Sequence, residues 1–246
     1  LGAVLGPISG GLIADRLGLR IVYIIAAVIF MISTIIILFT SKTSETHLAD
    51  QTSTINTGIL KNTRFFGFMA IMLVSIFALY LPQPFTPSFL QNQHEFSRSM
   101  IGLFGAIGSL GNAVATLALG NLNAMLGFII GQVWVLVFSI TFLVADLPFW
   151  FGFGYFFIGG YRLCRSMVLA ISRTLVHPRQ TGLAYGIVET LNAIAVIAAP
   201  VLAGLLYNKD PYSVYVVSII LITATILLNT FILVIQKRKH ADEPAN

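Results

Sequence analysis

Three ionisable side chains stand inside long apolar stretches, and they are the residues best suited to carry chemistry. Arg162 and Arg165 lie within YFFIGGYRLCRSM, and Glu189 lies within LAYGIVETLNAI. A charge inside a membrane-spanning helix is costly, so such residues usually pair, move protons or bind a ligand. Glu189 is therefore a candidate for taking up a proton or a cation. Arg162 is a candidate for stabilising that carboxylate or for binding an anion.

The helices that carry these charges are neighbours in the sequence and are joined by a short turn. With a rise of roughly 1.5 Å per residue, Glu189 and Arg165 reach a similar depth, and Arg162 lies about one turn further out. Glu189 can thus pair with either arginine. The pair admits two roles: a coupling site, or a static lock between two helices in which Arg165 extends to the cytoplasmic side.

Other polar side chains recur at helical spacing on these segments. Tyr185 and Asn192 fall on the same helical face as Glu189. A polar face inside a span is expected to face a cavity or another helix rather than lipid. Each such residue can also serve as an interhelical hydrogen-bonding group. The remaining candidates for a substrate or ion pathway near mid-membrane are Tyr155, Tyr80 and Gln83.

The composition is that of an all-α membrane protein. Of the 246 residues, 57% are hydrophobic and 9% are charged, whereas soluble domains carry roughly 25% charged residues. The net charge of +5 is expected in loops at the membrane surface, not in a nucleic-acid site. The single cysteine and the scattered histidines match no metal-ligand spacing. We expect no metal, no cofactor and no enzymatic activity.

Apolar runs of membrane-spanning length set the domain organisation. We expect two helices in 1–40, a cytoplasmic linker in 41–63, a six-helix bundle in 64–236 and a frayed cytoplasmic tail in 237–246. Placing the basic tail in the cytoplasm satisfies the positive-inside rule. It predicts a multi-pass protein of the plasma (inner) membrane. The expected spans lie near 1–14, 19–40, 64–83, 98–121, 126–145, 148–172, 181–207 and 212–236.

Small residues mark the close helix contacts. A G-x-x-x-G-P-x-x-G-G motif opens the chain, and a similar small-Pro-x-x-small-Gly kink recurs at 199–204. Glycines also recur at every third position from Gly102 to Gly111 and predict a flat ridge. In a membrane, glycines let another backbone approach closely. The opening motif consists of Gly2, Gly6, Pro7, Gly10 and Gly11.

This opening motif resembles the fifth-helix signature of the major facilitator superfamily, as found in its proton-coupled drug exporters. The resemblance implies a facilitator-type helical bundle in which the chain is a fragment covering helices five to twelve, about eight of an expected twelve. The segment 11–20 also resembles the family's loop between helices two and three. That loop is cytoplasmic in the family, whereas alternation from the tail places 15–20 outside.

The resemblance implies secondary active transport by alternating access. The expected activity is proton-coupled efflux of a small amphipathic compound, by a monomer when full length, in the lipid bilayer. A sugar or anionic-metabolite facilitator is the alternative within transport. The alternative outside transport is a non-transporting relative, either receptor-like or degenerate. It is supported by Ala124 and Met125, which stand where the family's loop motif has an acid and a base. Arg162 favours an anionic substrate and Glu189 a cationic one, so the substrate charge stays open.

Overall fold

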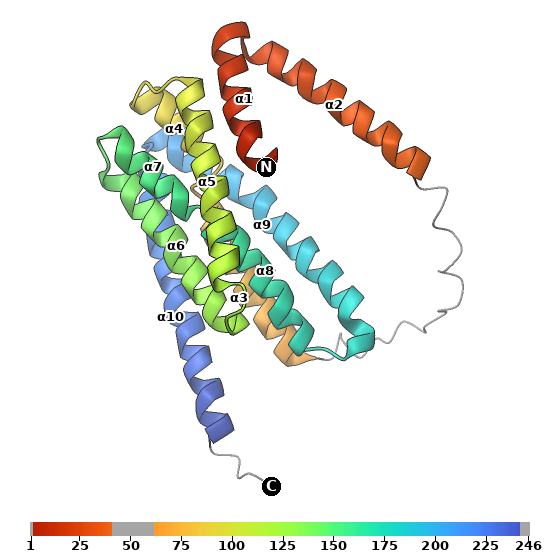
Figure 1. Ribbon diagram of the computed structural model, residues 1–246. Helices are drawn as coiled ribbons and strands as arrows, with labels where there is room; N and C mark the ends of the chain where they lie inside the picture. The colour runs from red at the N-terminus through yellow and green to blue at the C-terminus, as the bar shows by residue number, and fades with distance from the viewer. Residues whose placement is uncertain (1, 41–61, 242–246) are drawn as a thin grey trace.

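The computed structural model describes residues 2–40 and 62–241, and all regular secondary structure in these residues is helical (Figure 1). Six of the described helices are long and apolar enough to cross a membrane. The α-helices are α1 (Gly2–Leu17), α2 (Leu19–Thr40), α3 (Thr63–Tyr80), α4 (Thr86–Gln93), α5 (Arg98–Leu119), α6 (Ala124–Val144), α7 (Pro148–Phe157), α8 (Gly160–Thr174), α9 (Thr181–Lys209) and α10 (Ser213–Ala241), and a 3-10 turn, η3 (Pro178–Gln180), precedes α9.

The all-helical fold class is confirmed, but three element boundaries differ from the expected ones. The span expected at 148–172 is broken into α7 and α8, and the short helix α4 has no counterpart among the expected elements. Helix α10 continues to Ala241, whereas we expected a frayed tail from residue 237. Most of the expected linker, residues 41–61, and the last residues, 242–246, lie outside the described residues, as does Leu1.

The break between α7 and α8 lies where two neighbouring backbones come close to the chain. A Cβ added to Gly159 would lie 2.3 Å from the Asn112 backbone nitrogen of α5. A Cβ added to Gly160 would lie 2.5 Å from the Gly131 carbonyl oxygen of α6. Only glycine fits at two successive positions pressed against two helices. The hydropathy of the segment shows no sign of this break, because a turn buried among helices is as apolar as a helix.

The core of the bundle is aromatic and centres on α6. Phe142 and Phe138 of this helix pack with ring centroids 4.6 Å apart. Phe142 also contacts Phe151 of α7 and Tyr215 of α10, at centroid distances of 5.1 and 5.5 Å. All four side chains are almost fully buried. Aromatic pairs at these distances gain stability beyond their buried area, so α6, α7 and α10 form one packed unit.

Helix α1 lies along α5, and this contact is built on glycine. A Cβ added to Gly102 would lie 2.3 Å from the Pro7 carbonyl oxygen, and one added to Gly105 would lie 3.1 Å from Pro7 Cβ. A Cβ on Gly11 would lie 2.6 Å from the Arg98 carbonyl oxygen. Gly108 and Gly111 face α7 in the same way. The predicted close contacts at the glycines of α5 are therefore confirmed, but they face two different helices and do not form a single flat ridge.

Not every glycine of the opening motif serves this contact. In the part of the chain that the structure describes, a Cβ added to Gly2, Gly6 or Gly10 meets no atom within 4 Å. The close approach expected from the motif is thus found at Gly11, and the expectation is wrong for the other three. The reason is geometric: α1 presents only one face to α5, and that face carries Pro7 and Gly11.

Helix α2 leaves the bundle after α1 (Figure 1). None of its side chains between 19 and 39 is buried within the described residues. Its mean hydropathy of 3.0 is the highest of the described spans. An apolar helix with no buried face in water would be unstable, so α2 requires a lipid or protein environment.

Two hydrogen-bonded contacts mark opposite ends of the bundle. At one end, the Asp15 carboxylate of α1 accepts hydrogen bonds from the backbone N–H groups of Arg98 and Ser99, at 3.1 and 2.8 Å. At the other end, the Asn62 side chain donates to the Leu175 carbonyl oxygen at 2.8 Å. The loops expected outside and those expected inside therefore lie at different ends.

Candidate functional site

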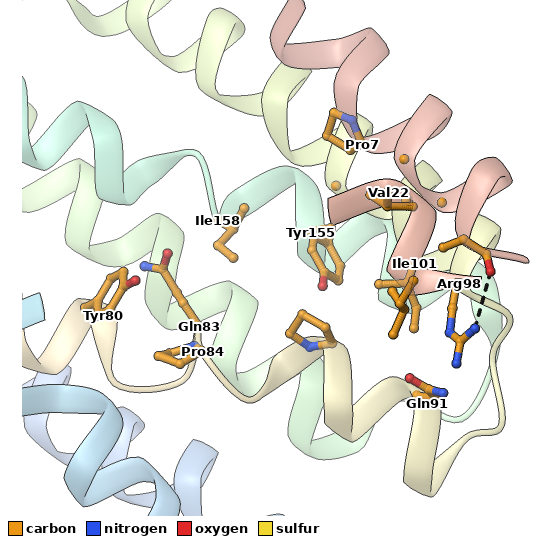
Figure 2. Close-up of a pocket in the computed structure, with 17 residues that line it drawn as sticks. Pro7, Val22, Tyr80, Gln83, Pro84, Gln91, Arg98, Ile101, Tyr155 and Ile158 are labelled. Carbon is orange, nitrogen blue, oxygen red and sulfur yellow. Dashed lines mark hydrogen bonds between the residues drawn. The ribbon is translucent and has the colours of Figure 1, made fainter. Parts of the chain in front are cut away.

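A cavity of about 590 Å³ lies where α1 and α2 meet α4, α5 and α7 (Figure 2). Its walls are largely apolar, with Pro7, Val22 and Ile101 among them. The volume falls within the range of about 300–1,000 Å³ that is typical of small-molecule sites. The neutral polar residues of its lining include Gln83, which lies beside Tyr80, and Gln91, which lies on the side of Arg98 (Figure 2). Arg98 lies at the far end, where its guanidinium donates to the Ala14 carbonyl oxygen at 3.3 Å (Figure 2).

A second cavity, of about 220 Å³, adjoins the first. The two share Gln83, Gly105, Tyr155 and Ile158 in their walls, so they form a larger and a smaller chamber around the same side chains. The smaller cavity is more polar. It adds Ser109, Asn112, Tyr161 and Arg162 to the lining.

Four of the residues predicted for the pathway line these cavities. Tyr80 borders the larger cavity, Arg162 the smaller one, and Gln83 and Tyr155 both. The Gln83 amide nitrogen donates to the Leu79 carbonyl oxygen at 2.8 Å. This bond anchors the side chain at the turn after α3. Ring stacking with Phe104, at a centroid distance of 5.7 Å, holds Tyr155 in place.

Glu189 and Arg165 form an ion pair away from the cavities. The Arg165 Nη2 to Glu189 Oε2 distance is 2.5 Å, and the two side chains are 47% and 41% exposed. The pair links α8 to α9. Of the two arginines considered as partners, the structure selects Arg165. Neither member of the pair lines either cavity.

Tyr161 joins the two groups of residues, and sequence reasoning did not select it. Its hydroxyl donates to the Asn192 side-chain oxygen at 3.3 Å, and its ring lies 5.5 Å from that of Tyr80. It also lines the smaller cavity. Tyr185, by contrast, lines neither cavity. Position 161 precedes Arg162, and an aromatic hydroxyl beside a membrane charge was the available signal.

The predicted residues thus form two neighbouring groups instead of a single polar pathway. Arg162 and Arg165 both lie on α8, but Arg162 lines the smaller cavity whereas Arg165 reaches Glu189 of α9. Within residues 2–40 and 62–241, no group of three His, Cys, Asp or Glu side chains is placed to hold a metal ion.

The whole chain is similar to a known family of proteins. A family model described as Major Facilitator Superfamily matches residues 1–159 and, in a second match, residues 69–246. Together the two matches run the length of the chain. The chain belongs to the Major Facilitator Superfamily. A search of curated proteins gives no match.

Membership of this superfamily assigns the protein to the multi-pass secondary transporters of small molecules. The superfamily consists of transporters and not, in general, of enzymes.

Proposed function

We propose that this facilitator exports a small amphipathic compound in exchange for protons, and that the chain covers helices five to twelve of a twelve-helix bundle. The observation that carries the proposal is the pair of adjoining cavities, whose walls include Tyr80, Gln83, Tyr155 and Arg162. An apolar cavity joined to a more polar one suits a molecule with an apolar body and a polar group.

The assignment of α1 as helix five is supported by the two ends of the bundle. Asp15 lies with the start of α5, and Asn62 lies with the end of α8 at the opposite end. Alternation from a cytoplasmic tail then places Asp15 outside. The rival assignment makes α1 and α2 helices two and three, and it requires the segment 11–20 to be a cytoplasmic loop.

The ion pair between Arg165 and Glu189 supplies a candidate coupling element. A proton on Glu189 would neutralise the carboxylate and release Arg165, so that α8 and α9 would no longer be held by opposite charges. The competing role is a permanent lock between these helices. The two roles differ in what loss of the carboxylate charge does to transport.

The test uses the complete protein in liposomes with an imposed pH gradient and a set of amphipathic fluorescent dyes of different charge. We expect gradient-driven dye movement that a protonophore abolishes. In Glu189→Gln, gradient-driven movement should be lost, while dye exchange without a gradient should persist, because binding and helix movement do not need the proton. Arg173→Gln, which removes a cation from the exposed end of α8, is the matched control.

Two results would contradict the proposal. No dye moving under any gradient would remove the amphipathic-export function. Loss of both gradient-driven transport and exchange in Glu189→Gln, together with reduced thermal stability, would assign the pair to the structural lock.

A further inference from the structure

We infer that the adjoining cavities bind an amphipathic organic anion, with Arg162 holding its charged group; this deepens the proposed function and rests on it. The first argument is the set of charged residues that line the cavities. Arg98 and Arg162 line the cavities, and no Asp or Glu of the residues that the structure describes does so. An apolar site with positive charge and no carboxylate favours an anion over a cation.

Two carboxylates on the helices discussed above, Glu189 and Asp15, are engaged elsewhere. Glu189 is paired with Arg165 on the α8–α9 side. Asp15 accepts hydrogen bonds from the backbone and hydroxyl of Ser99 and from the backbone of Arg98, at the start of α5. Neither carboxylate is available to neutralise a cation inside the cavities.

The two cavity arginines differ in what they already bind. The Arg98 guanidinium donates to the Ala14 carbonyl oxygen. The Arg162 guanidinium has no hydrogen-bond or ion-pair partner within residues 2–40 and 62–241. An unpaired guanidinium at membrane depth is costly, and an anion that entered the cavity would remove that cost. Arg162 is therefore the residue with unused binding capacity.

The remaining walls define the rest of the ligand. Asn112 and Tyr161 in the smaller cavity offer neutral hydrogen-bonding groups close to the charged end. Pro7, Pro84 and Ile101 line the larger cavity and fit an apolar body. The arrangement predicts a ligand whose sulfonate or carboxylate lies in the smaller cavity and whose hydrocarbon or ring lies in the larger one.

The test measures binding of three ring-matched probes to the complete protein in nanodiscs of zwitterionic lipid. The probes are naphthalene-2-sulfonate, naphthalene-2-sulfonamide and 2-naphthyltrimethylammonium, which share a ring system and differ in charge. We expect the sulfonate to bind about tenfold or more tightly than the other two, since hydrogen bonds to charged groups exceed neutral ones. Arg162→Gln should remove that preference, Arg162→Lys should retain part of it, and Arg173→Gln should not change it.

The sulfonamide monitors the fold, because its binding in Arg162→Gln should remain at the wild-type level. The inference is overturned if the ammonium probe binds as tightly as the sulfonate, if the sulfonate does not bind, or if Arg162→Gln leaves sulfonate binding unchanged. Its failure is separable from that of the proposed function. Gradient-driven movement of cationic dyes alone would refute the anion site and leave export standing. Arg162-dependent sulfonate binding without any gradient-driven transport would support the anion site and refute proton-driven export.

Discussion

The contact between α1 and α5 gives the sharpest test of the structure, through Gly102→Ala. A Cβ at this position would lie 2.3 Å from the Pro7 carbonyl oxygen, whereas ordinary contact begins at 3.4 Å. The difference of about 1.1 Å must be taken up by moving one helix backbone against the other, since a carbonyl oxygen inside a helix cannot rotate away. Overpacking of this kind costs about 1–3 kcal/mol.

The assay is the midpoint temperature of thermal unfolding of the purified complete protein in one detergent. For a chain of this size, about 1–3 kcal/mol corresponds to a decrease of roughly 2–12 °C. The matched control is Gly6→Ala on the other side of the interface. No atom among the described residues lies within 4 Å of its added Cβ, and alanine favours the helix by about 0.5–1 kcal/mol over glycine. We therefore expect an unchanged or slightly raised midpoint for the control.

The reasoning would be refuted if Gly102→Ala and Gly6→Ala had the same midpoint. That result would mean that α1 does not lie against α5 at the distance the structure gives. A decrease in both variants would instead show that another backbone approaches Gly6, as the opening motif alone suggested.

Three further predictions follow from the described contacts. Burial among aromatic rings lowers the pKa of His94 below its ordinary 6.5, although Asp146 opposes the shift. This residue should therefore contribute its full stabilisation above about pH 6.5, and the stability of the protein should fall as the pH drops below that value. An unfolding midpoint that falls equally with pH in wild type and in His94→Phe would contradict this. Gln132 is fully buried and neither of its amide atoms has a partner in the described residues, so Gln132→Leu should raise stability by about 1–3 kcal/mol; a lower unfolding midpoint would show that the amide has a use. Hydrogen bonds from Ser99 hold the pKa of Asp15 below its usual value. The Asp15 carboxylate, which caps the start of α5 by accepting from the Arg98 and Ser99 N–H groups, should therefore stay charged and bound between pH 5 and 8. Asp15→Ala should speed hydrogen exchange in the first turn of α5, and unchanged exchange would argue against the cap.

Much of the fold is determined by properties that are local in the sequence. Hydropathy adds up residue by residue, so the apolar runs predict the helices and their approximate ends without knowledge of their neighbours. The Glu189–Arg165 pair was among the two predicted pairings, because a short turn and a fixed helical rise set the depth of both residues. Close contacts at the glycines of α5 were predictable from the sequence, but which helix each one contacts was not. Successive members are offset by about 60° around the helix, so Gly102 contacts α1 and Gly111 contacts α7.

The candidate site was decided by tertiary structure. Three findings depend on which parts of the chain approach from a distance in the sequence. They are the break at 158–159, the contact of Tyr161 with Asn192, and the contact of α5 with Gly11 instead of Gly6. The position of Arg162 beside the smaller cavity is likewise a result of the packing. A one-dimensional pattern records which residues are apolar or charged, but the direction in which a helix face points is set by packing between segments far apart in the sequence. For this reason the sequence by itself determined the class of protein and its approximate spans, and the packed structure determined which of the predicted residues line the cavities.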